Sequence, residues 1–162
     1  MSYFVTGGTG FIGRFLIERL AKRKGTIYVL VRRGSKQKYK DLLERTGLSS
    51  DRLVAINGDL SKPRLGISAK DMATLKGSVK HFYHLAAIYD LKADAASQEI
   101  ANVEGTKNAI AAAETMNAKC FHLASSIAAA GLYRGTFRED MFEEAKGLDH
   151  AYFRTKHVSE GL

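Results

Sequence analysis

The fold of this 162-residue chain is decided by the stretch Tyr3-Phe4-Val5-Thr6-Gly7-Gly8-Thr9-Gly10-Phe11-Ile12-Gly13. A short apolar run leads into a glycine-rich turn, and the turn leads into an amphipathic segment. The apolar stripe of this segment, expected to face the core, consists of Phe11, Phe15, Leu16 and Leu20. This order predicts a strand, a tight turn and a helix, in which Gly7 permits the turn, Gly10 lets the backbone approach a pyrophosphate and Gly13 lets the helix lie close to the strand. The unpaired amides at the start of the helix suit a phosphate. The stretch therefore predicts the start of a dinucleotide-binding βαβ unit.

Apolar runs along the rest of the chain predict five strands, most of them separated by helical patterns. The strands are expected at 3–6, 27–31, 53–57, 81–85 and 120–124. Helices are expected from 11 to a C-terminal Gly25, then at 39–46, 69–75, 97–116, and from about 150 onward. Strands that alternate with helices predict an α/β fold, a Rossmann-type doubly wound parallel sheet, in one domain over residues 1–162. Such sheets bind ligands where the strands end.

The composition is that of an ordinary globular domain, with 45% hydrophobic and 26% charged residues. No stretch approaches the roughly 18–20 apolar residues that span a membrane. The first strand starts at once, so we expect no leader peptide. Cys120 is the only cysteine and lies in an apolar run, so we expect a small core residue and no disulfide. These features favour the cytoplasm.

The net charge of +8 raises the possibility of nucleic-acid binding. No known nucleic-acid motif is present, and the densest basic run, Arg32–Lys40, lies where a phosphorylated cofactor would sit. We therefore predict no nucleic-acid partner and interpret the remaining charge as solvated surface.

The five histidines do not predict a metal site. His81 and His84 are three apart on one expected strand and so point to opposite faces, and His122 stands alone on another. Structural metal sites usually gather four ligands.

Tyr152 and Lys156 are four residues apart on the last expected helix, which places both side chains on one face. A free tyrosine has a pKa of about 10, and a nearby ammonium lowers it. Tyr152 would then give a proton to a carbonyl oxygen while hydride arrives from a nicotinamide. Both residues are predicted to be catalytic and to contact the cofactor.

The residues that follow the second strand indicate which cofactor is used. NAD sites place a carboxylate there, on the ribose 2′-hydroxyl. This chain has Arg32 and Arg33 instead. A guanidinium pairs well with a 2′-phosphate, which predicts NADP.

The spacing G-x-x-G-x-x-G and the phrase at 6–13 resemble the extended short-chain dehydrogenase/reductase superfamily. The resemblance implies that Ser126, after the fifth strand, orients the substrate oxygen beside Tyr152. It also implies that Asn102, in N-x-x-G-T, supports the active-site backbone. The further cofactor contacts that it implies are Thr6, Gly7, Gly10, Phe11, Ile12, Gly13, Asp59, Leu60, Leu85, Ala86 and Ala87.

Phrases between these motifs, at 64–67, 85–90, 125–131 and 137–145, resemble the N-terminal domain of bacterial fatty acyl-CoA reductases that form fatty alcohols. This implies NADPH-dependent reduction of a long-chain acyl thioester or fatty aldehyde. It also implies that the chain stops before a substrate-binding region, is inactive by itself and self-associates as a homo-oligomer. Two alternatives remain: a nucleotide-sugar epimerase or dehydratase of the same superfamily, which would use NAD, and a non-catalytic dinucleotide-binding protein.

Overall fold

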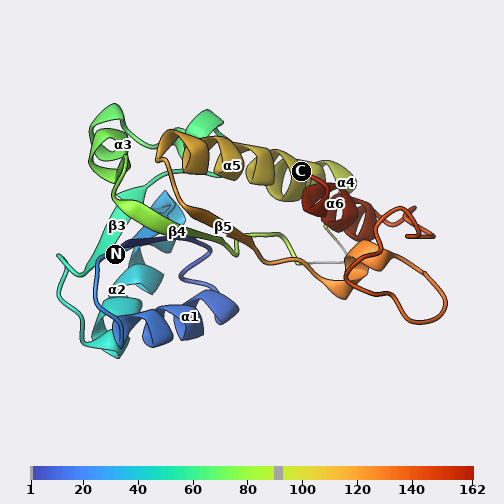
Figure 1. The fold of residues 1–162 in the computed structure, drawn as a ribbon. Helices are drawn as coiled ribbons and strands as arrows, with labels where there is room; N and C mark the ends of the chain where they lie inside the picture. Colours follow the sequence, from blue (N-terminus) through green and yellow to red (C-terminus); the bar gives the residue numbers. More distant parts are fainter. Residues whose placement is uncertain (1, 90–92) are drawn as a thin grey trace.

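A computed structural model describes residues 2–89 and 93–162. Five parallel strands form one sheet in the order β3-β2-β1-β4-β5 (Figure 1). Their bounds, each within two residues of the prediction, are β1 Ser2–Thr6, β2 Ile27–Val31, β3 Leu53–Asn57, β4 Val79–His84 and β5 Cys120–Leu123. The strand order reverses beside β1, because β1 pairs with β2 on one side and with β4 on the other. The Rossmann-type α/β fold is confirmed.

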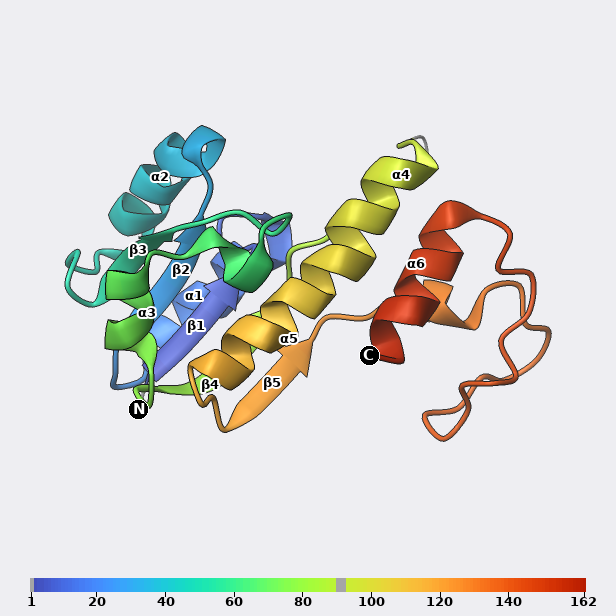
Figure 2. The ribbon, with the colours of Figure 1, turned by 90° about the horizontal axis from the view of Figure 1, so that it is seen from above.

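Helices cover both faces of the sheet, with α1 and α2 on one face and α3 and α5 on the other (Figure 1). Their bounds are α1 Phe11–Ala21, α2 Lys36–Thr46, α3 Ala69–Leu75, α4 Ala95–Gln98, α5 Gly105–Thr115 and α6 Ala151–Glu160. Helix α6 packs beside α4, beyond the end of the sheet (Figure 2). Among the described residues, no helix is long and apolar enough to cross a membrane.

Each face of the sheet has its own apolar core. Phe4 and Phe82 pack with α3 and α5, whereas Val5 and Val29 pack with Ile17 of α1. Strands that are buried on both faces read as continuous apolar runs, which explains why 3–5 shows no polar alternation.

Helix α1 is rotated from the predicted packing. Phe11 and Phe15, expected to face the core, are 72% and 45% exposed, and the buried positions are Gly13, Ile17 and Leu20. The cause is the close approach of Gly13 to the turn, where a Cβ would lie 2.2 Å from the Gly7 carbonyl oxygen. Two residues along a helix correspond to about 200°, so turning Gly13 inward turns Phe11 and Phe15 outward.

Two helix ends also differ from the prediction. Helix α1 ends at Ala21 with Lys22 as its C-cap, so Gly25 lies in the connection and is not the C-terminal glycine. Helix α2 begins at Lys36, three residues before the predicted start, after a single 3-10 turn at Arg33–Ser35.

The predicted helix over 97–116 is helical, but its turns are not uniform. A π-helical segment, Glu99–Glu104, lies between α4 and α5. Within it, the Asn102 carbonyl accepts hydrogen bonds from the hydroxyls of Thr106 (2.6 Å) and Ser159 (2.9 Å). Hydroxyls that bond helical carbonyls in this way often bend a helix.

Cys120 is exposed, and the prediction of a small core residue was wrong. It opens β5, which is the last strand of the sheet within the described residues. An apolar run alone does not distinguish a central strand from an edge strand.

Candidate active site

The glycine turn joins the ends of β1 and β4. Gly7 has φ +69°, and a Cβ there would lie 2.7 Å from the Ala86 nitrogen, so only glycine fits between the two strand ends. The Gly10 amide donates to the Gly7 carbonyl (2.9 Å). Gly10 is the N-cap residue of α1, and this helix has no side-chain cap and no acidic residue in its first turn. Gly8 was not singled out in the sequence, yet a Cβ there would lie 2.8 Å from side-chain atoms of Ile17 and Val29.

A buried chain of hydrogen bonds lies beneath this turn. The Ala86 amide donates to Thr6 Oγ1 (3.4 Å), which lies 2.7 Å from His84 Nδ1, and His84 Nε2 lies 3.2 Å from Thr106 Oγ1. The Thr106 hydroxyl donates to the Asn102 carbonyl, so it accepts from a proton on His84 Nε2. In the neutral ring Nδ1 is then the acceptor, and the Thr6 hydroxyl donates to it. Burial, helped by the charge of Lys156, lowers the pKa of His84 from 6.5 to about 4.

Thr6 was predicted to contact the cofactor, but its side chain is fully buried. Its hydroxyl is used by the chain of hydrogen bonds described above. The side chain therefore fixes the turn and the end of β4 from below, whereas Phe11 and Ile12 at the start of α1 are exposed.

Arg32 and Arg33, both exposed, follow β2 as predicted. Arg32 Nε donates to Ser35 Oγ at 3.4 Å. Asp59, after β3, accepts from the backbone amide and the hydroxyl of Ser61 (2.9 and 2.8 Å). These bonds lower the pKa of Asp59, with smaller contributions from the charges of Lys62 and Arg32. Val31 and Asn57 are register partners, so Arg32 and Asp59 follow neighbouring strand ends.

Leu60, Leu85, Ala86 and Ala87 also follow strand ends. The Leu60 carbonyl accepts from Asn108 Nδ2 of α5 (2.8 Å), and the Leu85 amide donates to the Thr6 carbonyl (3.2 Å). Ala87 is exposed beyond them. Together with the glycine turn, these positions follow the carboxyl ends of β1, β3 and β4, which lie at the same edge of the parallel sheet.

Helix α6 holds the segment that contains Ser126. Lys156 Nζ donates to the Ala124 carbonyl (2.8 Å), and His157 Nδ1 lies 3.0 Å from the Ala129 carbonyl. Ser126 lies between these two anchors and caps the 3-10 turn Ile127–Ala130 by accepting from the Ala128 amide (3.2 Å). The oxygen of Ser126 is thus used as an acceptor, which leaves its hydrogen to be donated.

Tyr152 lies in the first turn of α6 and is only 6% exposed. Its amide is capped by His150 Nδ1 (3.1 Å), and its ring meets the exposed Tyr89 ring edge-on at 5.4 Å. Lys156, one turn along, is 5% exposed, and its burial lowers its pKa, an effect that the Glu160 carboxylate partly offsets.

Asn102 connects the chain after β4 to α6. Its Oδ1 accepts from the Ile88 amide (2.8 Å), and its Nδ2 donates to the Ile88 carbonyl (3.3 Å) and to Thr155 Oγ1 (3.2 Å). This is the backbone-supporting placement that the N-x-x-G-T motif predicts. Asp90, the last residue of the phrase at 85–90, falls outside the described residues.

Other contacts of the site were not predicted from the sequence. The Ser125 hydroxyl donates to the Glu160 carboxylate. His122 is not isolated, since its Nε2 lies 3.1 Å from His81 Nδ1 with Cys120 beside them. Both contacts join positions more than 30 residues apart, and no local pattern signals them.

Comparison with known proteins assigns the chain to a family. A family model described as "Male sterility protein" matches residues 5–162. The chain belongs to the male sterility protein family. The fold of this family is that of the extended short-chain dehydrogenase/reductase superfamily, as the resemblance predicted.

Relatives of this male sterility family member occur in two settings. The chain is 32% identical over 180 residues to the fatty acyl-CoA reductase wat of Drosophila melanogaster, covering 94% of the chain and 34% of that protein. It is 31% identical over 172 residues to a linear gramicidin synthase polypeptide of Brevibacillus parabrevis, covering 98% of the chain and 3% of that protein. The chain therefore spans about a third or less of these two curated relatives.

Two solved structures share the fold of this chain. The terminal R domain of the myxalamid PKS-NRPS pathway superposes with a TM-score of 0.81 at 30% identity, over 98% of this chain and 43% of that domain. UDP-glucuronic acid 4-epimerase of Bacillus cereus shares the fold, with a TM-score of 0.74 at 23% identity, over 99% of this chain and 50% of the epimerase.

Proposed function

We propose that this male sterility family member is the cofactor-binding and catalytic part of an NADPH-dependent reductase. Its substrate would be a long-chain acyl thioester or the corresponding fatty aldehyde. The observation that carries the proposal is the double anchoring of the Ser126 segment to α6 by Lys156 and His157. It ties Ser126 to the helix that bears Tyr152 and Lys156. The relatives named above, a fatty acyl-CoA reductase and an R domain, support the substrate class.

The residues at the sheet edge fit a dinucleotide. The space at Gly10 is open except for the Gly7 carbonyl at 3.1 Å from an added Cβ, and the start of α1 offers amides without a side-chain cap. We assign the pyrophosphate to Gly7–Gly13, the 2′-phosphate to Arg32 and Arg33, and the adenine to Asp59 and Leu60. Leu85–Ala87 would line the remaining path. NADPH, when bound, supplies a hydride to the carbonyl carbon.

The residues of α6 and Ser126 would handle the carbonyl oxygen. The Ser126 hydrogen, which its capping bond leaves free, donates to that oxygen and orients it. Tyr152 donates its phenolic proton as the hydride arrives. Lys156, buried and held by Ala124, keeps positive charge beside the resulting phenolate and has hydrogens left for the nicotinamide ribose.

The chemistry balances in two steps. Hydride and proton added to a thioester give a hemithioacetal, which releases a thiol and leaves an aldehyde. A second hydride and proton give the alcohol. Each step oxidises one NADPH to NADP+, so cofactor consumption reports both.

The test follows NADPH oxidation by the full natural protein with a long-chain acyl-CoA and with a fatty aldehyde. We expect Tyr152→Phe to lower the acyl-dependent rate by about 100-fold or more, since it removes the proton donor, while NADPH still binds. Tyr133→Phe is the matched control, because this half-buried tyrosine contacts Phe137 in a loop outside the site.

Two outcomes would contradict the proposal. If neither acyl-CoA nor aldehyde is reduced while the protein turns over a nucleotide sugar with NAD, the epimerase alternative is correct. If NADPH binds and nothing is turned over, the protein is a dinucleotide-binding module.

A further inference from the structure

A row of four rings crosses β1, β4 and β5 on the face that carries α1. The His81 ring stacks on Tyr3 (5.9 Å between centroids) and on His122 (5.3 Å), and His122 stacks on Tyr83 (4.4 Å). In the register of β4 and β5, His81 is paired with Cys120 and Tyr83 with His122. Parallel partners project to the same side of a sheet, so Cys120 joins the two histidines on one face.

The three side chains bring good metal ligands together. Their ligand atoms, two imidazole nitrogens and the Cys120 sulfur, all lie within 4.8 Å of one another. His81 Nδ1 and His122 Nε2 are 3.1 Å apart. In a tetrahedral zinc site with Zn–N bonds of about 2.0–2.1 Å, two nitrogens are about 3.4 Å apart, so a shift of a few tenths of an ångström makes room for the ion.

We propose that His81, Cys120 and His122 bind one zinc ion across β4 and β5, with water as the fourth ligand. Nitrogen and thiolate donors suit zinc, whereas magnesium and calcium prefer oxygen. Three protein ligands leave one position open. On binding, the Cys120 thiol releases its proton and both imidazoles stay neutral. The site lies on the sheet face and not at the carboxyl edge where the proposed reductase residues gather.

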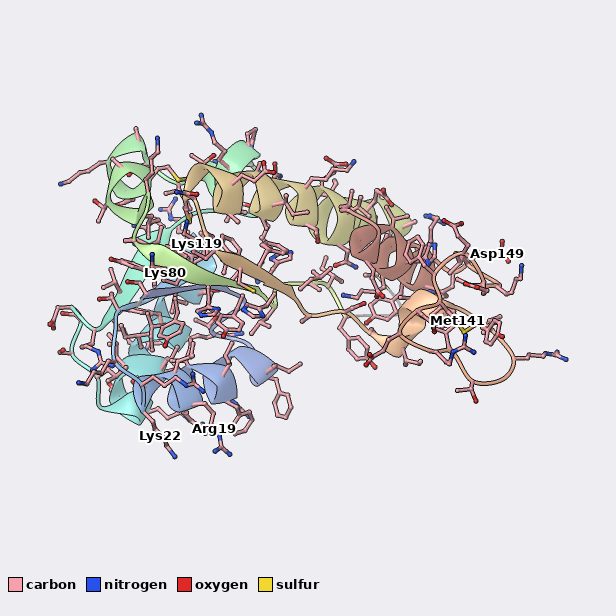
Figure 3. All side chains as sticks on the ribbon, viewed as in Figure 1. Arg19, Lys22, Lys80, Lys119, Met141 and Asp149 are labelled. Atoms are coloured by element: carbon pink, nitrogen blue, oxygen red, sulfur yellow. The ribbon has the colours of Figure 1, made fainter. Side chains whose placement is uncertain are left out.

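A neighbouring ring orients one of the proposed ligands, and basic residues flank the site in the sequence. Tyr83 packs on the His122 ring, so the ring keeps its orientation. Lys80 and Lys119, both labelled in Figure 3, directly precede the ligands His81 and Cys120. Because side chains alternate along a strand, Lys80 projects to the opposite face from His81.

The ion would link β4 to β5. Ligands from both strands would be held in one coordination sphere, and a ligand that binds only the folded state raises stability. We therefore expect zinc to raise the melting temperature of the protein.

The experiment uses the untagged full chain and titrates it with Co²⁺ as a spectroscopic substitute for Zn²⁺. We expect one ion per chain, with the visible bands of tetrahedral cobalt and a sulfur-to-metal charge-transfer band. In a parallel assay, zinc should slow alkylation of Cys120 by iodoacetamide. This assay reads one site, because Cys120 is the only cysteine of the chain.

Variants locate the ligands. Cys120→Ser should abolish the charge-transfer band, and His81→Gln or His122→Gln should weaken cobalt binding at least about tenfold, since even supporting residues of metal sites cost that much. His150→Asn is the control: it removes an exposed histidine outside the cluster and keeps a side-chain acceptor for the cap of α6.

The proposal is overturned if cobalt gives no charge-transfer band and zinc leaves alkylation unchanged. It is also overturned if binding persists in Cys120→Ser and in both histidine variants. The 3.1 Å contact of the two histidines would then be a hydrogen bond between neutral rings. The wild-type alkylation assay decides the matter even if a variant fails to fold.

Discussion

Arg32 is the residue on which cofactor choice depends in the proposed site. Arg32→Ala removes a charge-assisted hydrogen bond to a 2′-phosphate, worth about 1.5–3 kcal/mol. We expect NADPH affinity to fall about ten- to a hundredfold and NADH affinity to stay nearly constant. Fluorescence titration with both nucleotides measures this. Arg138→Ala, an exposed arginine paired with Asp140, is the control. An equal loss for both nucleotides would refute a role at the 2′-phosphate.

His84 makes the stability of the fold depend on pH. Its pKa falls from 6.5 to about 4 in the folded protein, so between these values the unfolded state binds a proton that the folded state does not. The stability is fully present above pH 6.5 and is lost as the pH falls, by about 3 kcal/mol at pH 4.

Replacing His84 tests this linkage. We expect His84→Gln to flatten the dependence of unfolding free energy on pH between 6.5 and 4, because glutamine does not titrate there. Denaturant unfolding across this range measures the slope. His150→Asn, which changes an exposed histidine, should leave the slope as it is. An unchanged slope in His84→Gln would show that other groups cause the acid sensitivity.

At the scale of elements, α1 and the glycine turn approach each other closely. A Cβ at Gly13 would lie 2.2 Å from the Gly7 carbonyl oxygen, whereas a Cβ at Gly34 meets nothing within 4 Å. We expect Gly13→Ala to cost about 3 kcal/mol or more, because backbone must move, and Gly34→Ala to be nearly neutral. Thermal melts of both variants compare the two costs, and equal melting temperatures would disprove the close approach.

The elements were largely predictable because their signals are local. Apolar runs located all five strands, and the Ser68–Asp71 capping box marks the start of α3, where the Ser68 hydroxyl accepts from the Asp71 backbone amide as the motif requires. The rotation of α1 was missed because the apolar stripe of Phe11 and Phe15 is locally convincing. Only the approach of Gly13 to the turn, a tertiary constraint, decides which side faces the core.

At the scale of the whole molecule, the net charge raises a question that can be tested: whether the protein binds nucleic acid as well as the proposed NADPH. The charge of +8 supports only sequence-independent attraction to nucleic acid. We expect any binding of a labelled duplex to fall steeply between about 50 and 200 mM salt in an anisotropy assay. Changing Arg32 and Arg33 to alanine should then weaken NADPH binding more than duplex binding. Tight duplex binding that survives at high salt would contradict this interpretation.

The candidate site was predictable where motifs follow strand ends, because every parallel strand ends at the same edge. Arg32 was predicted in this way, whereas Asp59 and Ser126 were predicted from the family resemblance, and all three follow strand ends in the structure. The contacts that hold the site together were not predictable, since Asn102 reaches Thr155 across 53 residues and Lys156 reaches Ala124 across 32. Such pairs have no spacing rule and depend on how α6 packs.

The π-helical segment Glu99–Glu104 has a consequence for how this protein tolerates change in length. One residue corresponds to about 100° of rotation in an α-helix. Deleting a residue here would restore regular α-helical turns, but it would rotate α4 by about 100° around the axis of α5. Asn102 would then no longer point at Ile88 and Thr155. Substitutions on the outer side of this turn should leave the fold intact. Deletion of one residue would break the hydrogen bonds that join this segment to α6. The number of residues in this turn is therefore constrained more tightly than their identity.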